Sequence, residues 1–158
     1  MPTVPWTPTA PVHAGADYLI MATRFTVARR RDMLRVIAAS NGLWSGIART
    51  EGLVGYSISS RPARGTLATV SAWRDRDAML AFVRGGAHQK LVQQTRELMR
   101  ESAFASWGAH GAALPPDWAS AEQQLDAGLS AARSGRIPYE HATMLLAGPR
   151  AGMRAGRG

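Results

Sequence analysis

Residues 66–107, TLATVSAWRDRDAMLAFVRGGAHQKLVQQTRELMRESAFASW, decide the fold that we predict for this chain. The stretch opens with a run of apolar and β-branched residues that is typical of a strand and ends at Trp73. A short amphipathic helix is predicted next, followed by a break at the glycine pair 85–86 and a second helix that begins near His88. A further strand is predicted at 104–110. Strand, helix and strand in this order indicate an α+β unit in which helices cover a sheet.

The residues before this stretch complete the unit. Residues 17–26 and 53–60 are rich in aromatic and branched side chains and predict two more strands, the second joined to 66–73 by a Pro/Gly turn. Residues 27–49 predict an amphipathic helix between them. The complete order is the split βαβ, or ferredoxin-like, α+β fold with four antiparallel strands. The apolar stripe predicted for the first helix has members at steps of three and four: Leu34, Ile37, Asn41, Trp44 and Ala48.

Composition divides the chain into three parts. An extended proline-rich arm is predicted at 1–16, the α+β domain at 17–133, and a basic, loosely ordered tail at 134–158. The domain includes an extra C-terminal helix, since Asp117 is a residue type that caps helices and the helical pattern continues to Arg133.

Both faces of the predicted sheet are apolar, although a half-solvated antiparallel sheet should alternate with polar residues. In the first strand Tyr18, Ile20 and Ala22 point to one side, and Leu19, Met21 and Phe25 point to the other. Helices of this fold cover one face only. We therefore expect a second subunit on the other face, and so a homodimer with its sheets packed face to face.

Charge and cysteine content exclude several classes of function. The 19 basic and 11 acidic residues give a net charge of +8, but the excess lies partly in the tail and otherwise on both sides of the body, so nucleic acid is not the expected partner. The chain has no cysteine, which excludes disulfides, thiolate metal sites and cysteine nucleophiles. No apolar run is long enough for a membrane span and no signal peptide is evident, so we expect a cytoplasmic protein.

Three segments carry a resemblance to a known family: EGLVGY at 51–56, SAWRD at 71–75, and 82–88 with its histidine. With this element order, residues 17–110 resemble the dimeric α+β barrel superfamily, and within it the antibiotic-biosynthesis-monooxygenase-like and heme-binding monooxygenase-like proteins. The resemblance implies a monooxygenase-like oxidoreductase of secondary metabolism that acts on an aromatic or polycyclic small molecule. It implies either heme or no cofactor, since the superfamily contains both kinds of enzyme.

His88 is the leading site residue that the resemblance implies, because a helical histidine binds heme iron in the heme-degrading branch. That branch also uses an asparagine in the first strand, where this chain has Thr23 and Arg24. We expect His88, Trp73 and Arg24 to be catalytic, and His88 and Trp107 to contact a cofactor, with His88 on the iron if heme is bound. Tyr18 and Tyr56 are further candidates to line the pocket, whereas His13, His110 and His141 are expected to be exposed.

The plainer alternatives remain open from the sequence. His88 follows a Gly-Gly-Ala turn and could satisfy loop carbonyl groups, or it could act in acid/base chemistry. The two tryptophans could be core residues. Two other classes of function compete with an oxygenase: a non-oxidative cyclase or dehydratase of the same fold, and a binding or assembly module that uses the arginine-rich tail.

Overall fold

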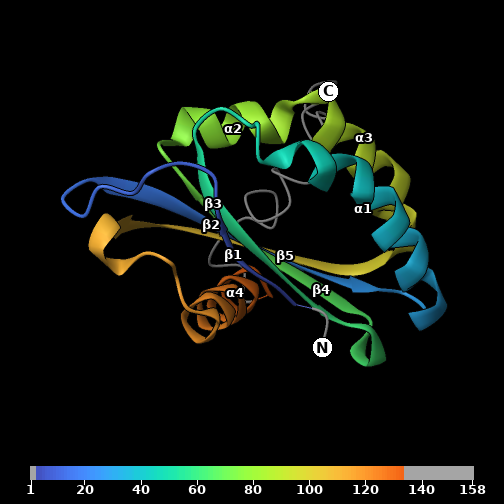
Figure 1. The fold of residues 1–158 in the computed structure, drawn as a ribbon. Helices are drawn as coiled ribbons and strands as arrows, with labels where there is room; N and C mark the ends of the chain where they lie inside the picture. The colour runs from blue at the N-terminus through green and yellow to red at the C-terminus, as the bar shows by residue number, and fades with distance from the viewer. Residues whose placement is uncertain (1–2, 134–158) are drawn as a thin grey trace, which may run out of the picture.

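A five-stranded antiparallel sheet, with helices on both of its faces, forms the centre of the molecule in a computed structural model that describes residues 3–133 (Figure 1). The strand order is β1-β3-β4-β2-β5, which is the ferredoxin-like order with one strand added. The predicted α+β fold class is thereby confirmed. The elements in chain order are β1 (Thr3–Pro8), β2 (Asp17–Val27), η1 (Arg30–Asp32), α1 (Met33–Ile47), β3 (Leu53–Arg61), η2 (Pro62–Arg64), β4 (Thr66–Trp73), α2 (Arg76–Arg84), α3 (Gly86–Thr95), η3 (Arg96–Leu98), β5 (Met99–His110), η4 (Gly111–Ala113) and α4 (Trp118–Arg133).

The prediction of four strands was wrong because part of the proline-rich arm joins the sheet. β1 pairs antiparallel with β3, from Thr3 opposite Ser59 to Pro8 opposite Gly55. The ring of Trp6 lies against Gly55, where a β-carbon would overlap it. Glycine at this position therefore lets an indole ring cover the end of the sheet.

Helices α1, α2 and α3 cover one face of the sheet, as the sequence predicted (Figure 1). The inward stripe of α1 differs from the predicted one by about one residue: Leu34 is 75% exposed, and the buried positions are Met33, Val36, Ser40, Leu43 and Ile47. Apolar residues occur on two sides of this helix, so the spacing alone did not identify the side that packs. In α2 the carboxylate of Asp75 caps the first turn by accepting a hydrogen bond from the Ala78 N–H group at 2.8 Å.

The second helical region ends earlier than predicted, and the strand after it begins earlier. α3 stops at Thr95, and β5 begins at Met99 instead of residue 104. The cause is strand pairing, because Val27 and Thr26 at the end of β2 lie opposite Met99 and Glu101. These long-range backbone hydrogen bonds override a weak local helical pattern.

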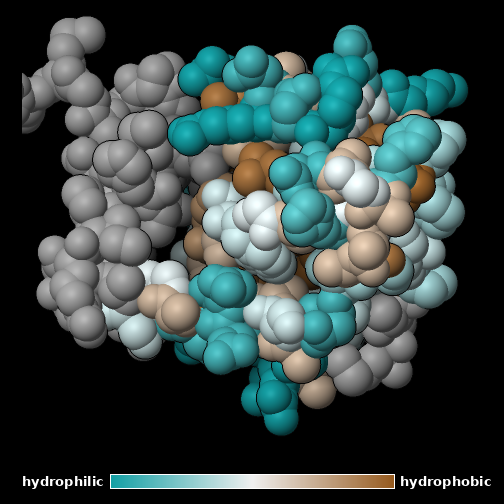
Figure 2. All heavy atoms as spheres, turned by 90° about the vertical axis from the view of Figure 1, so that its left-hand side faces the viewer, coloured by the Kyte–Doolittle hydropathy of each residue, from teal (hydrophilic) through white to brown (hydrophobic). Residues whose placement is uncertain are grey.

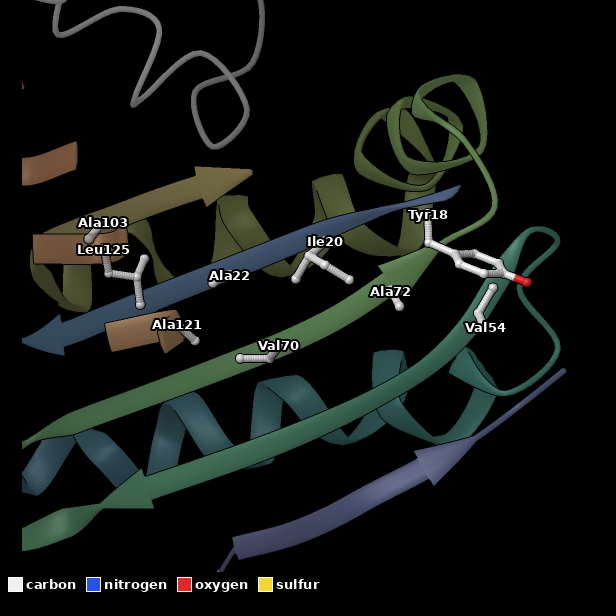
Figure 3. Close-up of a cluster of buried hydrophobic side chains, with 9 residues drawn as sticks. All are labelled: Tyr18, Ile20, Ala22, Val54, Val70, Ala72, Ala103, Ala121 and Leu125. Carbon is white, nitrogen blue, oxygen red and sulfur yellow. The ribbon is translucent and has the colours of Figure 1, made fainter. Parts of the chain in front are cut away.

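Helix α4 covers the face of the sheet for which a second subunit was expected. Its fully buried Ala121 and Leu125 pack on Ile20, Ala22 and the rest of a cluster that the sheet builds on this side (Figure 3). The predicted extra C-terminal helix is therefore present, and it packs against its own sheet. Gly128 permits the close approach, since a β-carbon there would lie 3.3 Å from the carbonyl oxygen of Phe104 in β5.

Candidate functional site

His88 lies in the first turn of α3, next to the end of α2. Its Nδ1 is 3.0 Å from the carbonyl oxygen of Val83, which also accepts a hydrogen bond from the Gln89 side chain at 2.7 Å. A carbonyl oxygen only accepts, so Nδ1 carries the proton in this contact and the neutral ring keeps its lone pair on Nε2. His88 thus satisfies a carbonyl group in the last turn of α2, where the plainer alternative expected a loop carbonyl, and it still has one nitrogen that could accept a proton or bind a metal.

Burial favours the neutral form of this histidine. It lowers the pKa of His88 below the usual 6.5, and the hydrogen bond to Val83 opposes that shift only in part. The ring is therefore uncharged at neutral pH. An uncharged imidazole with a free Nε2 is the form that acts as a general base.

Aromatic rings connect His88 to strand β4 of the sheet. The Phe82 ring lies 5.2 Å from the His88 ring and 5.0 Å from the ring of Trp73, measured between centroids. Trp73 is completely buried, and its Nε1 donates to the Ser71 hydroxyl at 2.9 Å. These distances are typical of packed aromatic pairs, so His88 and Trp73 share one apolar layer between the sheet and the helices.

Buried hydroxyl groups lie on the same side of the sheet, and our reading of the sequence did not assign them to the site. The Oγ atoms of Thr23 and Thr69 are 2.7 Å apart, and Ser71 is two residues further along β4. The sequence could have indicated this arrangement, because alternate residues of a strand face the same side of the sheet. Thr69, Ser71 and Trp73 are alternate residues of β4. The described buried polar side chains all have hydrogen-bond partners.

Arg24 and Trp107 lie on the opposite face of the sheet from His88. Arg24 follows Ile20 and Ala22 in the alternation of β2, and Trp107 pairs with Ile20 across the β2–β5 ladder. The Arg24 guanidinium donates to Glu122 at 2.6 Å and to Asp126 at 2.7 Å, both in α4. The structure therefore brings His88 together with Trp73 and separates both from Arg24 and Trp107.

The other candidates take different places. Tyr56 lies on the His88 side of the sheet and stacks on Trp44 at 5.8 Å, whereas Tyr18 belongs to the α4 side. His110 is exposed and contacts the Asp17 carboxylate at 3.0 Å, as expected for a surface residue. His141 and the predicted tail at 134–158 lie outside the described residues.

A shallow hollow of about 250 Å³ opens at the end of the sheet near the exposed His13, and Figure 2 looks onto this end of the molecule. The Tyr18 hydroxyl in its wall accepts the His13 N–H group at 3.0 Å, and Arg74 at its rim pairs with Asp75 at 2.9 Å. Neither His88 nor Trp73 lines it. The Tyr18 hydroxyl and the Arg74 guanidinium are thus engaged by neighbours, and the hollow is separate from the His88 layer.

Residues 3–133 contain no group of three metal-ligating side chains, and no helix among them is long and apolar enough to cross a membrane. A heme needs only one axial protein ligand, so this finding does not bear on heme. The chemistry of His88 fits such a ligand, because Val83 holds the proton on Nδ1 and leaves Nε2 for iron.

The fold is that of the antibiotic-biosynthesis-monooxygenase-like α+β proteins, as comparison with solved structures shows. The crystal structure of one antibiotic biosynthesis monooxygenase matches with a TM-score of 0.53 and 14% identity, over 58% of this chain and 97% of that chain. Rv0793 from Mycobacterium tuberculosis matches with a TM-score of 0.52 and 18% identity, over 57% and 92%. SnoaB from Streptomyces nogalater, a cofactor-independent oxygenase, matches at 0.49 and 21%, over 65% and 100%. At these identities the shared feature is the fold. No protein-family model and no curated protein matches the sequence.

Proposed function

We propose that the chain is a monooxygenase-like oxidoreductase that acts on an aromatic or polycyclic small molecule in the layer between the sheet and helices α1–α3. One arrangement carries the proposal: His88 has Nε2 free of the Val83 contact and packs in an aromatic layer with Phe82 and Trp73, where burial lowers its pKa and favours the uncharged ring. A general base in apolar surroundings suits removal of a phenolic proton, because water does not compete for the group.

The proposed reaction uses the substrate as its own reductant. His88 accepts the proton of a phenol whose keto form has a CH2 group in the ring, and the resulting anion is electron-rich at that carbon. O2 adds to this carbon, and a proton completes a hydroperoxide. Loss of one water then leaves a carbonyl group at the same carbon. The substrate supplies all electrons, one oxygen atom enters the product, and the other leaves as water.

The residues of the layer have distinct parts in this proposal. His88 accepts the proton, and the partly exposed Phe82 ring, which packs on the completely buried Trp73, provides an apolar wall beside it. Thr23, Thr69 and Ser71 add buried hydroxyl groups on the same face of the sheet, where they hydrogen-bond to each other or to neighbouring groups. We assign Arg24 and Trp107 to the packing of α4, since both lie on the other face.

Heme is the second candidate, favoured by the same Nδ1 contact. His88 Nε2 would hold the iron, and the heme would bind and activate O2. The two candidates share one site and differ in whether the purified protein absorbs visible light.

Absorption and oxygen consumption test the proposal together. The purified full chain should consume O2 with 9-anthranol, a polycyclic phenol, and His88→Gln should lose most of this activity. His110→Gln is the matched control, because His110 is exposed at the end of β5. A Soret band that is lost in His88→Gln assigns heme. A colourless protein that leaves O2 unconsumed contradicts an oxygenase, and turnover of the phenol without O2 would assign the non-oxidative class.

The homodimer remains part of the proposal, but with a different interface. Two sheets cannot pack face to face on the α4 side, because Ala121 and Leu125 of α4 fill that position. We propose that two copies meet through another surface of the molecule. Sedimentation equilibrium of the full chain measures the association, and a strict monomer at all concentrations contradicts it.

A further inference from the structure

Three segments that are distant in sequence, η1, η2 and η3, lie near one another at one end of the sheet, at the right-hand side of Figure 1, and each carries or adjoins exposed arginines. The Val27 N–H group donates to the carbonyl of Gly65 at 2.9 Å, and Ala28 N–H donates to the carbonyl of Leu98 at 2.8 Å. These bonds hold η1 between η2 and η3. The exposed arginines in and beside these three segments define what we call the arginine surface: the arginines at 29–31, Arg35, Arg64, Arg96 and Arg100.

The stability of the fold does not account for this surface. The arginines at 29–31 precede the first turns of α1, where the helix dipole disfavours positive charge. Asp32 is the carboxylate nearest in sequence, and it is buried, with Oδ1 3.7 Å from Arg35. Seven arginines face three carboxylates within the same segments, Asp32, Glu97 and Glu101. The repulsion among the arginines is relieved when an acidic partner approaches.

An exposed leucine lies among these arginines. Leu34 is 75% exposed, and the exposed Arg30 and Arg31 of η1 precede it by four and three residues. Ala38, one turn further on, is also exposed, so a short apolar strip continues along the outside of α1. Arginine is enriched in protein-binding surfaces, and an exposed apolar side chain among arginines adds an apolar contact to the ionic ones.

We propose that the arginine surface and Leu34 bind an acidic helical segment of another protein, with its carboxylates on the arginines and an apolar side chain on Leu34. The planar guanidinium groups suit carboxylates, which they can bind through two parallel hydrogen bonds. Single-stranded nucleic acid is less well matched, because the surface as defined contains no aromatic side chain on which bases could stack. The proposal is independent of the oxygenase chemistry.

Binding of synthetic probes tests this assignment, using the full chain and fluorescence anisotropy at physiological salt. The main probe is a peptide of about 18 residues, long enough to form a helix, with glutamates and two leucines on one face. A matched peptide has serine in place of the leucines. A single-stranded oligo-dT and phosphatidylglycerol vesicles represent the other anionic surfaces.

The leucine peptide should bind, and Arg30→Glu/Arg31→Glu should weaken it about tenfold or more because like charges then face each other. Leu34→Ser and the serine peptide should each weaken binding by a similar factor. Arg49→Glu/Arg76→Glu is the matched control, since both arginines are exposed outside the surface; it should bind as the unaltered chain does. Circular dichroism confirms that each variant folds.

Three results would overturn the assignment. The peptide could fail to bind, or bind equally well without its leucines or Leu34. Alternatively, oligo-dT or vesicles could bind more tightly through Arg30 and Arg31, which would assign the surface to nucleic acid or lipid instead.

Discussion

Replacement of Arg24 by methionine should destabilise the protein by about 2 kcal/mol, because the guanidinium joins β2 to α4 by two charge-assisted hydrogen bonds. Methionine keeps the aliphatic packing and removes the charge. Arg24 and Glu122 are 18% and 25% exposed, whereas Asp126 is 67% exposed. Of the two carboxylates, only that of Glu122 is largely shielded from water. The two couplings should therefore differ.

A double-mutant cycle separates the two contacts. We expect a coupling of about 1–1.5 kcal/mol between Arg24 and Glu122, and about 0.3 kcal/mol between Arg24 and Asp126, since solvent screens the second pair. Glu122→Gln and Asp126→Asn supply the other corners of each cycle. Urea unfolding followed by tryptophan fluorescence gives the free energies. Trp118 lies in α4 and donates to Ser57 at 3.2 Å, so its emission also reports release of this helix.

Two results would refute this reasoning. An unchanged urea midpoint in Arg24→Met would mean that α4 does not depend on the ion pairs. A larger coupling to Asp126 than to Glu122 would mean that burial does not rank the contacts. In 1 M salt the Asp126 coupling should disappear while most of the Glu122 coupling remains, because partly buried charges are less screened.

Three further predictions concern packing and titration. Gly55→Ala should lower the free energy of unfolding by about 1–3 kcal/mol, because the added methyl group overlaps the Trp6 ring. Gly42→Ala, where the added methyl group meets nothing on α1, should raise it by about 0.5–1 kcal/mol. Urea midpoints measure both changes. Burial lowers the pKa of His88 in the folded chain, so as pH drops below about 6.5, the pKa of an unfolded histidine, the unfolded chain takes up this proton first. The free energy of unfolding should therefore fall between that pH and the lowered pKa of the folded state. His88→Gln should remove this part of the pH dependence. Leu125→Ala should cost about 3 kcal/mol, and a cost below about 1 kcal/mol in thermal or urea unfolding would contradict tight docking of α4.

The sequence predicted the strands of the central sheet better than what covers them. Alternation in β2 separated Tyr18 and Ile20 from Leu19 and Met21, and the structure places these two sets on opposite faces. The pattern gives the two sides of a strand but not the neighbour of each side. For that reason α4 was foreseen as a helix, while the face that it covers was assigned to a second subunit.

The site could be predicted only in part, for related reasons. His88 and Trp73 lie in one layer because a strand end and a helix start are brought together by the short helix α2. Arg24 has the phase of Ile20 and Ala22, so the alternation itself could have placed it on the other face. The outward Leu34 was predicted as part of the apolar stripe of its helix, because periodicity does not distinguish a core contact from an exposed anchor.

The prolines of β1 determine how far the sheet can grow. β1 is the outermost strand beyond β3, and Pro5 and Pro8 remove backbone N–H groups from its six residues. A strand with missing donors is a poor template for another strand. The hydrogen-bonded ladder of the sheet therefore ends at β1. This disfavours the addition of a strand from another molecule at that edge.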